Sequence, residues 1–103
     1  MKLKATFVPA FSRDLKRIGK RDLDERKLLK VIDLILENTP AAIDELRRRH
    51  RMHTLVGKWK GNNECHVANA GDWLIVWKVC DGVAFFQRTG SHDEIFSSRP
   101  PLK

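Results

Sequence analysis

The chain has 103 residues, 42% of them hydrophobic, and 20 Lys and Arg against 13 Asp and Glu give it a net charge of +7. This apolar content excludes a chain that is disordered throughout, and the length predicts one domain, residues 1–103, with one modest core. No apolar stretch approaches the roughly 20 residues of a membrane-spanning helix, and no secretory signal core follows Met1, so we expect a cytoplasmic protein.

The first two elements follow from simple periodicities. Residues 2–8 alternate between apolar and polar side chains, which predicts a short strand with one buried face, ended by Pro9. Ser12 is the expected N-cap of a following helix, and Gly19 its expected end. The apolar face of this helix has the spacing i, i+4 and i+7 and consists of Phe11, Leu15 and Ile18.

A second helix is predicted over residues 23–37, where Asp22 and Glu25 resemble a capping box at its start. Its apolar stripe predicts that it packs on the core. Residues 41–48 can form a short extra helix. The basic run of residues 47–51, RRRHR, is typical of a solvated face or loop, although it could also follow a phosphate backbone.

The second half of the chain predicts a loop followed by strands. Residues 53–61 interleave lysine with tryptophan between glycines and are expected to form a loop, and Cys65 begins a strand. Asp81-Gly82 separates two runs of bulky apolar residues, which is a strong signal for a hairpin with a primed turn. The hairpin brings Arg88 to the end of a strand, and His92 follows after a turn at Gly90, so both lie near one end of the sheet.

These elements predict an α+β fold: a small antiparallel sheet of about four strands, covered on one face by an N-terminal helical hairpin. The first strand is expected at an edge or beside the last strand. The other face is less covered and leaves an open concave surface. Cys65 and Cys80 are expected to be buried free thiols.

The residues do not favour a metal site or a covalent nucleophile. The chain has no Cys-x-x-Cys and no His-Glu-x-x-His, and the pair His50 and His53 is a weak zinc signal. Cys65 and His66 are adjacent in a strand and point to opposite faces. No serine lies in a Gly-x-Ser-x-Gly elbow. No metal and no cofactor are therefore expected.

Metal-independent cleavage of RNA fits the residues better. The net charge indicates a polyanionic partner, which could be nucleic acid, a membrane surface or an acidic protein. Cleavage needs a base for the 2′-hydroxyl, an acid for the leaving 5′-oxygen and a cation for the phosphorane, roles that suit histidine and arginine. Structural roles stay open for the same residues: His66 as a half-buried strand histidine, Asp72 as a turn residue, the tryptophans and Phe96 as packing. Residue types alone support a basic RNA-binding domain with the parts of a nuclease.

The motifs of the second half resemble the YafQ branch of the RelE-like toxins, the toxin halves of bacterial type II toxin–antitoxin pairs. They occur in the family's order and with near-matching spacing, as HTLVGKWKG from His53, CHV from Cys65, DWLIVWK from Asp72, and FQRTGSH from Phe86 with Phe96. The resemblance implies a microbial-RNase-like fold and an endoribonuclease that cuts mRNA in the ribosomal A site. It also implies a neutralising antitoxin that forms a hetero-oligomer with the toxin, operator DNA bound only through that complex, and no membrane contact.

The resemblance further implies roles for individual residues. The family's catalytic positions fall on His53, His66, Asp72, Arg88 and His92. Arg88 would stabilise the phosphorane, His92 would lead proton transfer, and Asp72 would orient a histidine or transfer a proton itself. His53 and His66 would supply the complementary acid or base, or bind the phosphate. The substrate-binding positions would stack a base or hold the RNA backbone and are Phe96, Trp73, Lys58, Lys60 and Arg51.

Three features depart from the family pattern: a long linker over residues 38–52, an extended turn at residues 69–71, and Trp77 where tyrosine is more usual. None removes a candidate catalytic residue. Two other functions stay open. A non-catalytic member would bind only an antitoxin and operator DNA, and a general RNA-binding domain would need none of the histidines together.

Overall fold

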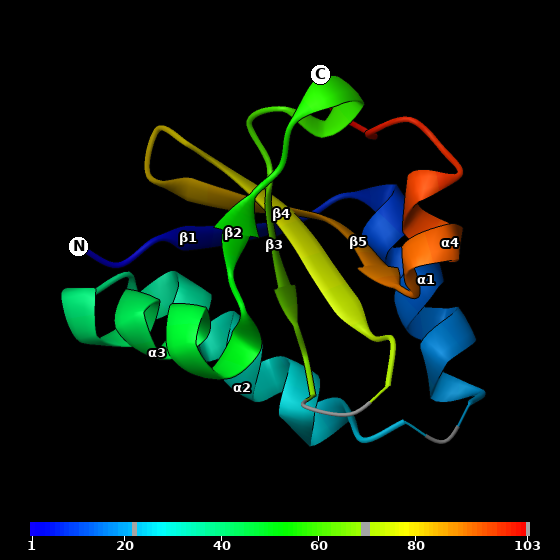
Figure 1. Cartoon of the computed structure of the whole chain (residues 1–103), viewed down its shortest axis with the longest axis horizontal. Helices are drawn as coiled ribbons and strands as arrows, with labels where there is room; N and C mark the ends of the chain where they lie inside the picture. Colours follow the sequence, from blue (N-terminus) through cyan, green and yellow to red (C-terminus); the bar gives the residue numbers. More distant parts are fainter. Residues whose placement is uncertain (22, 69–70, 103) are drawn as a thin grey trace.

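The structure is a computed structural model that describes residues 1–21, 23–68 and 71–102. A five-stranded sheet lies against helices, which confirms the α+β class (Figure 1). In chain order the elements are β1 (Lys4–Phe7), α1 (Pro9–Gly19), α2 (Glu25–Glu37), α3 (Pro40–His50), β2 (His53–Thr54), the 3-10 turn η1 (Gly57–Trp59), β3 (Asn63–His66), β4 (Leu74–Cys80), β5 (Val83–Gly90) and α4 (His92–Phe96).

The sheet has the strand order β1-β5-β4-β3-β2. β2, β3, β4 and β5 pair antiparallel with their neighbours, whereas β1 pairs parallel with β5 at the edge, one of the two positions predicted for it. The β4–β5 hairpin is confirmed. Asp81 and Gly82 have φ of 50° and 76°, and positive φ at both central residues is what a type I′ turn requires.

One face of the sheet carries the main core. Side chains of α1, α2 and α3 meet alternate residues of the strands there, and Trp77 and Phe86 are its largest members from the sheet. Each fully buried aliphatic or aromatic side chain contributes about 1.5–3 kcal/mol to stability. The predicted stripe of α2 is confirmed as core, with Leu28, Val31 and Ile35 at most 2% exposed.

The opposite face is covered only in part. A second, smaller core lies there, formed by Trp59, Leu74, Val76 and Ile95, with Phe96 packed against it. α4 and the η1 turn therefore seal one end of this face. The rest of the face stays open beside β2 and β3, and it holds the candidate site.

Several local predictions need correction. The residues of β1 are all exposed, so the predicted buried face is wrong. β1 lies at the edge of the sheet, whereas the main core lies over β3, β4 and β5. α1 begins at Pro9, and Val8 is its N-cap, so Ser12 lies inside the helix and does not cap it. Pro9 is the first helical residue, a position where proline is favoured. Asp24 caps α2 by accepting from the backbone N–H of Arg26, whereas Asp22 lies outside the described residues.

Three further differences concern α3, β2 and the cysteines. Residues 53 and 54, expected in a loop, form β2, because they pair with Glu64 and Asn63. α3 extends to His50, so the basic run makes its last turn, where cations favourably face the helix dipole. Cys65 and Cys80 are free thiols, but only Cys65 is buried. No helix in the described part of the chain is long and apolar enough to cross a membrane.

Candidate active site

The strand register gathers the candidate residues on the open face. His53, Glu64, Val76 and Arg88 are successive cross-strand partners of β2, β3, β4 and β5, so they form one row. Directly opposed residues of antiparallel strands share a face. His66 lies two residues after Glu64 and therefore belongs to the same face. Cys65 points the other way into the main core, as predicted.

A β-bulge places Arg88 in this row. Trp77 pairs with Phe86, but Val76 pairs with Arg88, so Gln87 is one extra residue in β5. Without it, Arg88 would oppose Ile75 and point into the main core, since a shift of one residue exchanges the faces. The side chain of Gln87 is buried, donates to Asn62 and accepts from the backbone N–H of Leu102 at 2.7 Å. The bulge is thus held by polar contacts on both sides.

His92 is positioned by the start of α4. Ser91 and Glu94 form a capping box, which fixes the first turn of this short helix. The backbone N–H of His92 donates to Asp72 at 3.2 Å, and its Nδ1 lies 2.7 Å from Asp72 Oδ1. The hydrogen bond from His92 lowers the pKa of Asp72 below its usual value, so this carboxylate is ionised beside the imidazole.

Aromatic rings border His92 on one side, and a second histidine lies on the other. The Phe96 ring is 5.9 Å from the His92 ring and packs edge-on against Trp59 at 5.3 Å. The His66 ring is 6.3 Å from the His92 ring. The structure therefore brings together four residues of the predicted set, His66, Asp72, His92 and Phe96, with Trp59 as a buried support beneath them.

His66 is half-buried, and its environment favours the neutral ring. Burial lowers its pKa first, and the positive charges of Arg51, His92 and His53 lower it further, against an opposing effect of Glu64. Its backbone carbonyl accepts from His50 Nδ1 at 2.7 Å, so α3 is tied directly to this strand. A histidine that is neutral near pH 7 can act as a base.

Glu64 is a member of the site that the sequence motifs did not single out. Its side chain is only 4% exposed, and Oε1 lies 3.6 Å from Nε2 of His53. His53 Nδ1 lies 3.1 Å from the carbonyl of Arg51, so both ring nitrogens face oxygen atoms. Glu64 could have been found from its spacing in the sequence, because a carboxylate two residues before His66 in a strand lies on the same face as that histidine.

Arg88 is held in place by a buried ion pair that was also missed. Its Nε donates to Asp14 Oδ2 at 2.6 Å and its Nη2 to Asp14 Oδ1 at 3.1 Å, while Nη1 donates to Ser98 Oγ and Nη2 to the carbonyl of Glu94. Asp14 is 1% exposed and also accepts from the backbone N–H of Thr89. Asp14 could have been found from the sequence, because it is the one carboxylate of α1 and lies on the apolar face of the helix, one turn after Phe11.

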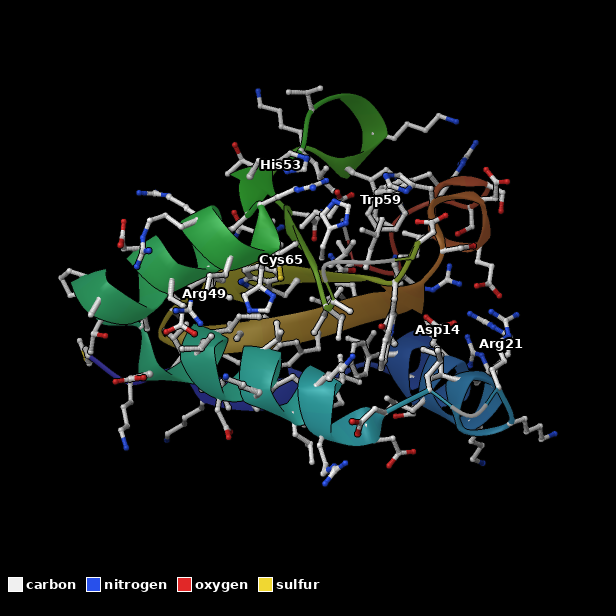
Figure 2. All side chains as sticks on the ribbon, turned by 60° about the horizontal axis from the view of Figure 1, so that its bottom comes forward. Asp14, Arg21, Arg49, His53, Trp59 and Cys65 are labelled. Atoms are coloured by element: carbon white, nitrogen blue, oxygen red, sulfur yellow. The ribbon has the colours of Figure 1, made fainter. Side chains whose placement is uncertain are left out.

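The same network continues over the surface of α1. Arg17 bridges Asp14 and Glu94, and Arg21 forms two hydrogen bonds with Glu94. Hydrogen bonding by Arg21 is the main cause that lowers the pKa of Glu94 to about 2. Figure 2 shows Asp14 and Arg21 on this side of the molecule, away from His53, which lies by β2.

The remaining predicted residues differ in position. Trp73 is 6% exposed and its Nε1 donates to Thr89 Oγ1, so the structure makes it a packing residue, because its ring fills the main core. Lys58 and Lys60 are exposed on either side of the buried Trp59. Arg51 is exposed and ends α3 in a left-handed conformation. In residues 1–21, 23–68 and 71–102, no three His, Cys, Asp or Glu side chains are grouped to hold a metal ion.

The arrangement resembles known proteins along almost its whole length. Residues 3–97 match the family described as bacterial toxin of type II toxin–antitoxin system, YafQ. The mRNA interferase toxin YafQ of Escherichia coli K12 is 35% identical over 89 residues, which cover 84% of this chain and 87% of that protein. The crystal structure of YafQ from E. coli BL21(DE3) has a TM-score of 0.79 and 30% identity over 92% of this chain and 99% of its own. The toxin in the crystal structure of the E. coli DinJ-YafQ toxin–antitoxin complex has a TM-score of 0.74 and 30% identity, over 93% of this chain and 99% of its own.

Proposed function

Because this chain belongs to the YafQ family of bacterial type II toxins, we propose that His66 and His92 cut mRNA by attack of the RNA 2′-hydroxyl, without a metal ion. The chain is an mRNA interferase, an endoribonuclease, and its partner is a cognate antitoxin. The observation that carries the mechanism is the pair of histidine rings 6.3 Å apart, one of them 2.7 Å from a carboxylate.

The two histidines have different environments, which divides the proton transfers between them. His66, whose pKa is lowered by burial, takes the proton of the 2′-hydroxyl as O2′ attacks phosphorus. His92, whose Nδ1 lies 2.7 Å from the Asp72 carboxylate, gives a proton to O5′ as the P–O5′ bond breaks. The products are a 2′,3′-cyclic phosphate and a 5′-hydroxyl. Each proton transfer accounts for roughly 10²–10⁴ in rate.

The other site residues would stabilise charge and hold the substrate. Arg88 supplies positive charge to the phosphorane from its row on the sheet, held rigidly by Asp14. Of the five N–H groups of a guanidinium, four are donated to Asp14, Glu94 and Ser98, so Arg88 acts on the phosphate through the remaining N–H and through its charge. Phe96 stacks a base beside His92, and Lys58 and Lys60 hold the RNA backbone.

We place the reaction in the ribosomal A site, where the mRNA is single-stranded and accessible. The antitoxin neutralises the toxin in a hetero-oligomer, and operator DNA is bound only through that complex. The protein works in the cytoplasm, as one domain over residues 1–103.

The test maps cuts on one mRNA with and without translating ribosomes, for the wild-type chain, His92→Gln and the surface control Arg13→Gln. Wild type and the control are expected to cut at fixed codon positions only on translated mRNA, and His92→Gln is expected to lose cutting. Cuts by His92→Gln as strong as those of wild type would overturn the assignment of His92. Equal cutting of untranslated mRNA would overturn the placement in the A site.

A further inference from the structure

A basic groove lies beside the site, between α2, the last turn of α3 and the end of β3. It encloses about 740 Å³, and five of its lining side chains are lysine or arginine, against the single carboxylate of Glu45. The cationic residues are Lys27, Lys30, Arg48, Arg49 and Arg51. Figure 2 shows Arg49 between the ribbons of α3 and α2.

These cations come from two elements, and the dipole of α3 accounts for those at its end but not for Lys27 and Lys30 of α2. Lys27 and Lys30 are one turn apart on α2, and all five cations are exposed, whereas the contacts that hold α2 in the fold are made by its apolar stripe. Arg48 pairs with Asp44 on its own helix, and Glu45 is the one carboxylate in the lining, so the groove keeps a net positive charge. Gathering like charges costs stability when nothing binds between them. The groove is therefore suited to a ligand that carries several negative charges.

The groove is linked to the candidate active site in two ways, through a hydrogen bond of His50 and through a second hollow. His50 lines it and donates from Nδ1 to the carbonyl of His66. A second hollow shares Lys27 and Ala68 with the groove and continues to Asp72. A strand of RNA that leaves the site past Asp72 would therefore enter the groove.

We propose that this groove binds the phosphate backbone of the mRNA strand, at nucleotides outside the cleaved step. The inference rests on the proposed function, because it assigns the groove to the substrate of the same site. The lining favours a nucleic acid over an antitoxin segment: its apolar members are only Val67 and Ala68, and a bound protein segment would need buried aromatic or aliphatic anchors. Backbone binding adds affinity and leaves codon choice to the site.

The test uses a 20-nucleotide 2′-O-methyl RNA, which lacks the attacking hydroxyl and so reports binding alone. Lys30→Gln/Arg49→Gln is compared with Arg13→Gln/Lys16→Gln, a matched loss of two exposed charges on α1. Two lost phosphate contacts should weaken binding roughly tenfold at 0.15 M salt and reduce the salt slope by about 1.4, since each contact to a single strand contributes about 0.7. The α1 control should keep the wild-type slope.

Equal affinity and salt slope in the groove variant and the α1 control would overturn the inference. So would a groove variant that loses affinity for the antitoxin while it keeps affinity for the RNA, because the groove would then belong to the antitoxin. Thermal unfolding of both variants shows whether the fold is intact. Cutting of translated mRNA by the wild-type chain is measured in parallel. Its failure would contradict the proposed function, while the oligonucleotide result still decides whether the groove binds RNA.

Discussion

Two sides of the candidate site are built in opposite ways. On the side formed by α1, β5 and α4, here called the arginine side, Arg88 is 13% exposed and bound to the buried Asp14. On the side formed by β2, β3 and the start of α4, here called the histidine side, the side chains of His53 and His92 are each 54% exposed. The arginine side is fixed by ion pairs before a substrate arrives. The histidine side is open to solvent and to RNA.

This difference separates positioning from proton transfer. A guanidinium held by a buried carboxylate keeps its charge in one place and needs no reorganisation during the reaction. Histidines that exchange protons with substrate must be accessible, and each needs only one partner to orient it. Variants on the arginine side should therefore change stability and activity together, whereas variants on the histidine side should change activity alone.

The largest effect is expected for Asp14→Asn. It leaves the Arg88 guanidinium without its buried counter-ion, and removal of one partner of a buried pair costs about 3–5 kcal/mol. The free energy of unfolding, measured in urea, should fall by that amount, and mRNA cutting should fall with it. Asp44→Asn is the matched control, because Asp44 forms an exposed pair with Arg48. A loss as small for Asp14→Asn as for Asp44→Asn would contradict the account of the arginine side.

The next effect is expected for His92→Gln. The rate of mRNA cutting should fall roughly 10²–10⁴-fold, the usual contribution of a proton-transfer group. The melting temperature should stay within error of the wild type, since the His92 side chain is half exposed and its removal opens no cavity in the core. A destabilisation comparable to that of Asp14→Asn would show that the two sides do not differ as described.

A smaller effect is expected in the titration of His66. Arg51 lowers and Glu64 raises the pKa of His66. The pKa of His66 should therefore rise in Arg51→Gln and fall in Glu64→Gln. NMR of the histidine ring protons against pH measures both. In the wild type the folded-state pKa lies below the unfolded value, so this group stabilises the fold above about pH 6.5 and loses that contribution as pH falls through the folded pKa. Shifts of the same sign in the two variants would contradict the electrostatic description.

The smallest effect is expected for Arg21→Gln, at the exposed rim of the arginine side. Hydrogen bonding to Arg21 lowers the pKa of Glu94 to about 2, so Glu94 stabilises the fold above its unfolded pKa of about 4.5 and loses this contribution as pH falls toward 2. The variant should raise that pKa and narrow the difference in unfolding free energy between pH 7 and pH 3. An unchanged difference would show that the contact does not stabilise the fold.

The sequence predicted the architecture well because its signals are local. The Asp81-Gly82 turn and the apolar stripe of α2 each depend on a few neighbouring residues. His66 and His92 were also singled out, since they stand in short motifs that resemble those of the family, and their rings lie 6.3 Å apart in the structure. The resemblance was confirmed by the match over residues 3–97.

Arg88 was predicted as a site residue, but its buried ion pair with Asp14 was not, because that pair is a contact between distant parts of the chain. Asp14 and Arg88 are 74 residues apart, and the extra residue Gln87 that turns Arg88 to the site face cannot be read from the strand itself. β2 was missed for a similar reason, since two residues carry no periodicity and become a strand only by pairing with β3. Trp73 was assigned to the substrate, whereas its environment is the core.

The central claim, that the RNA 2′-hydroxyl attacks under proton transfer by His66 and His92, is tested most directly on the substrate. A translated mRNA with a single 2′-deoxynucleotide at a mapped cut site is compared with the unmodified mRNA, and the ends of the products are identified. The account predicts that the deoxy substitution abolishes that cut and that the unmodified mRNA yields a 2′,3′-cyclic phosphate and a 5′-hydroxyl. Persistent cutting at the deoxynucleotide, or a product with a 5′-phosphate, would contradict it.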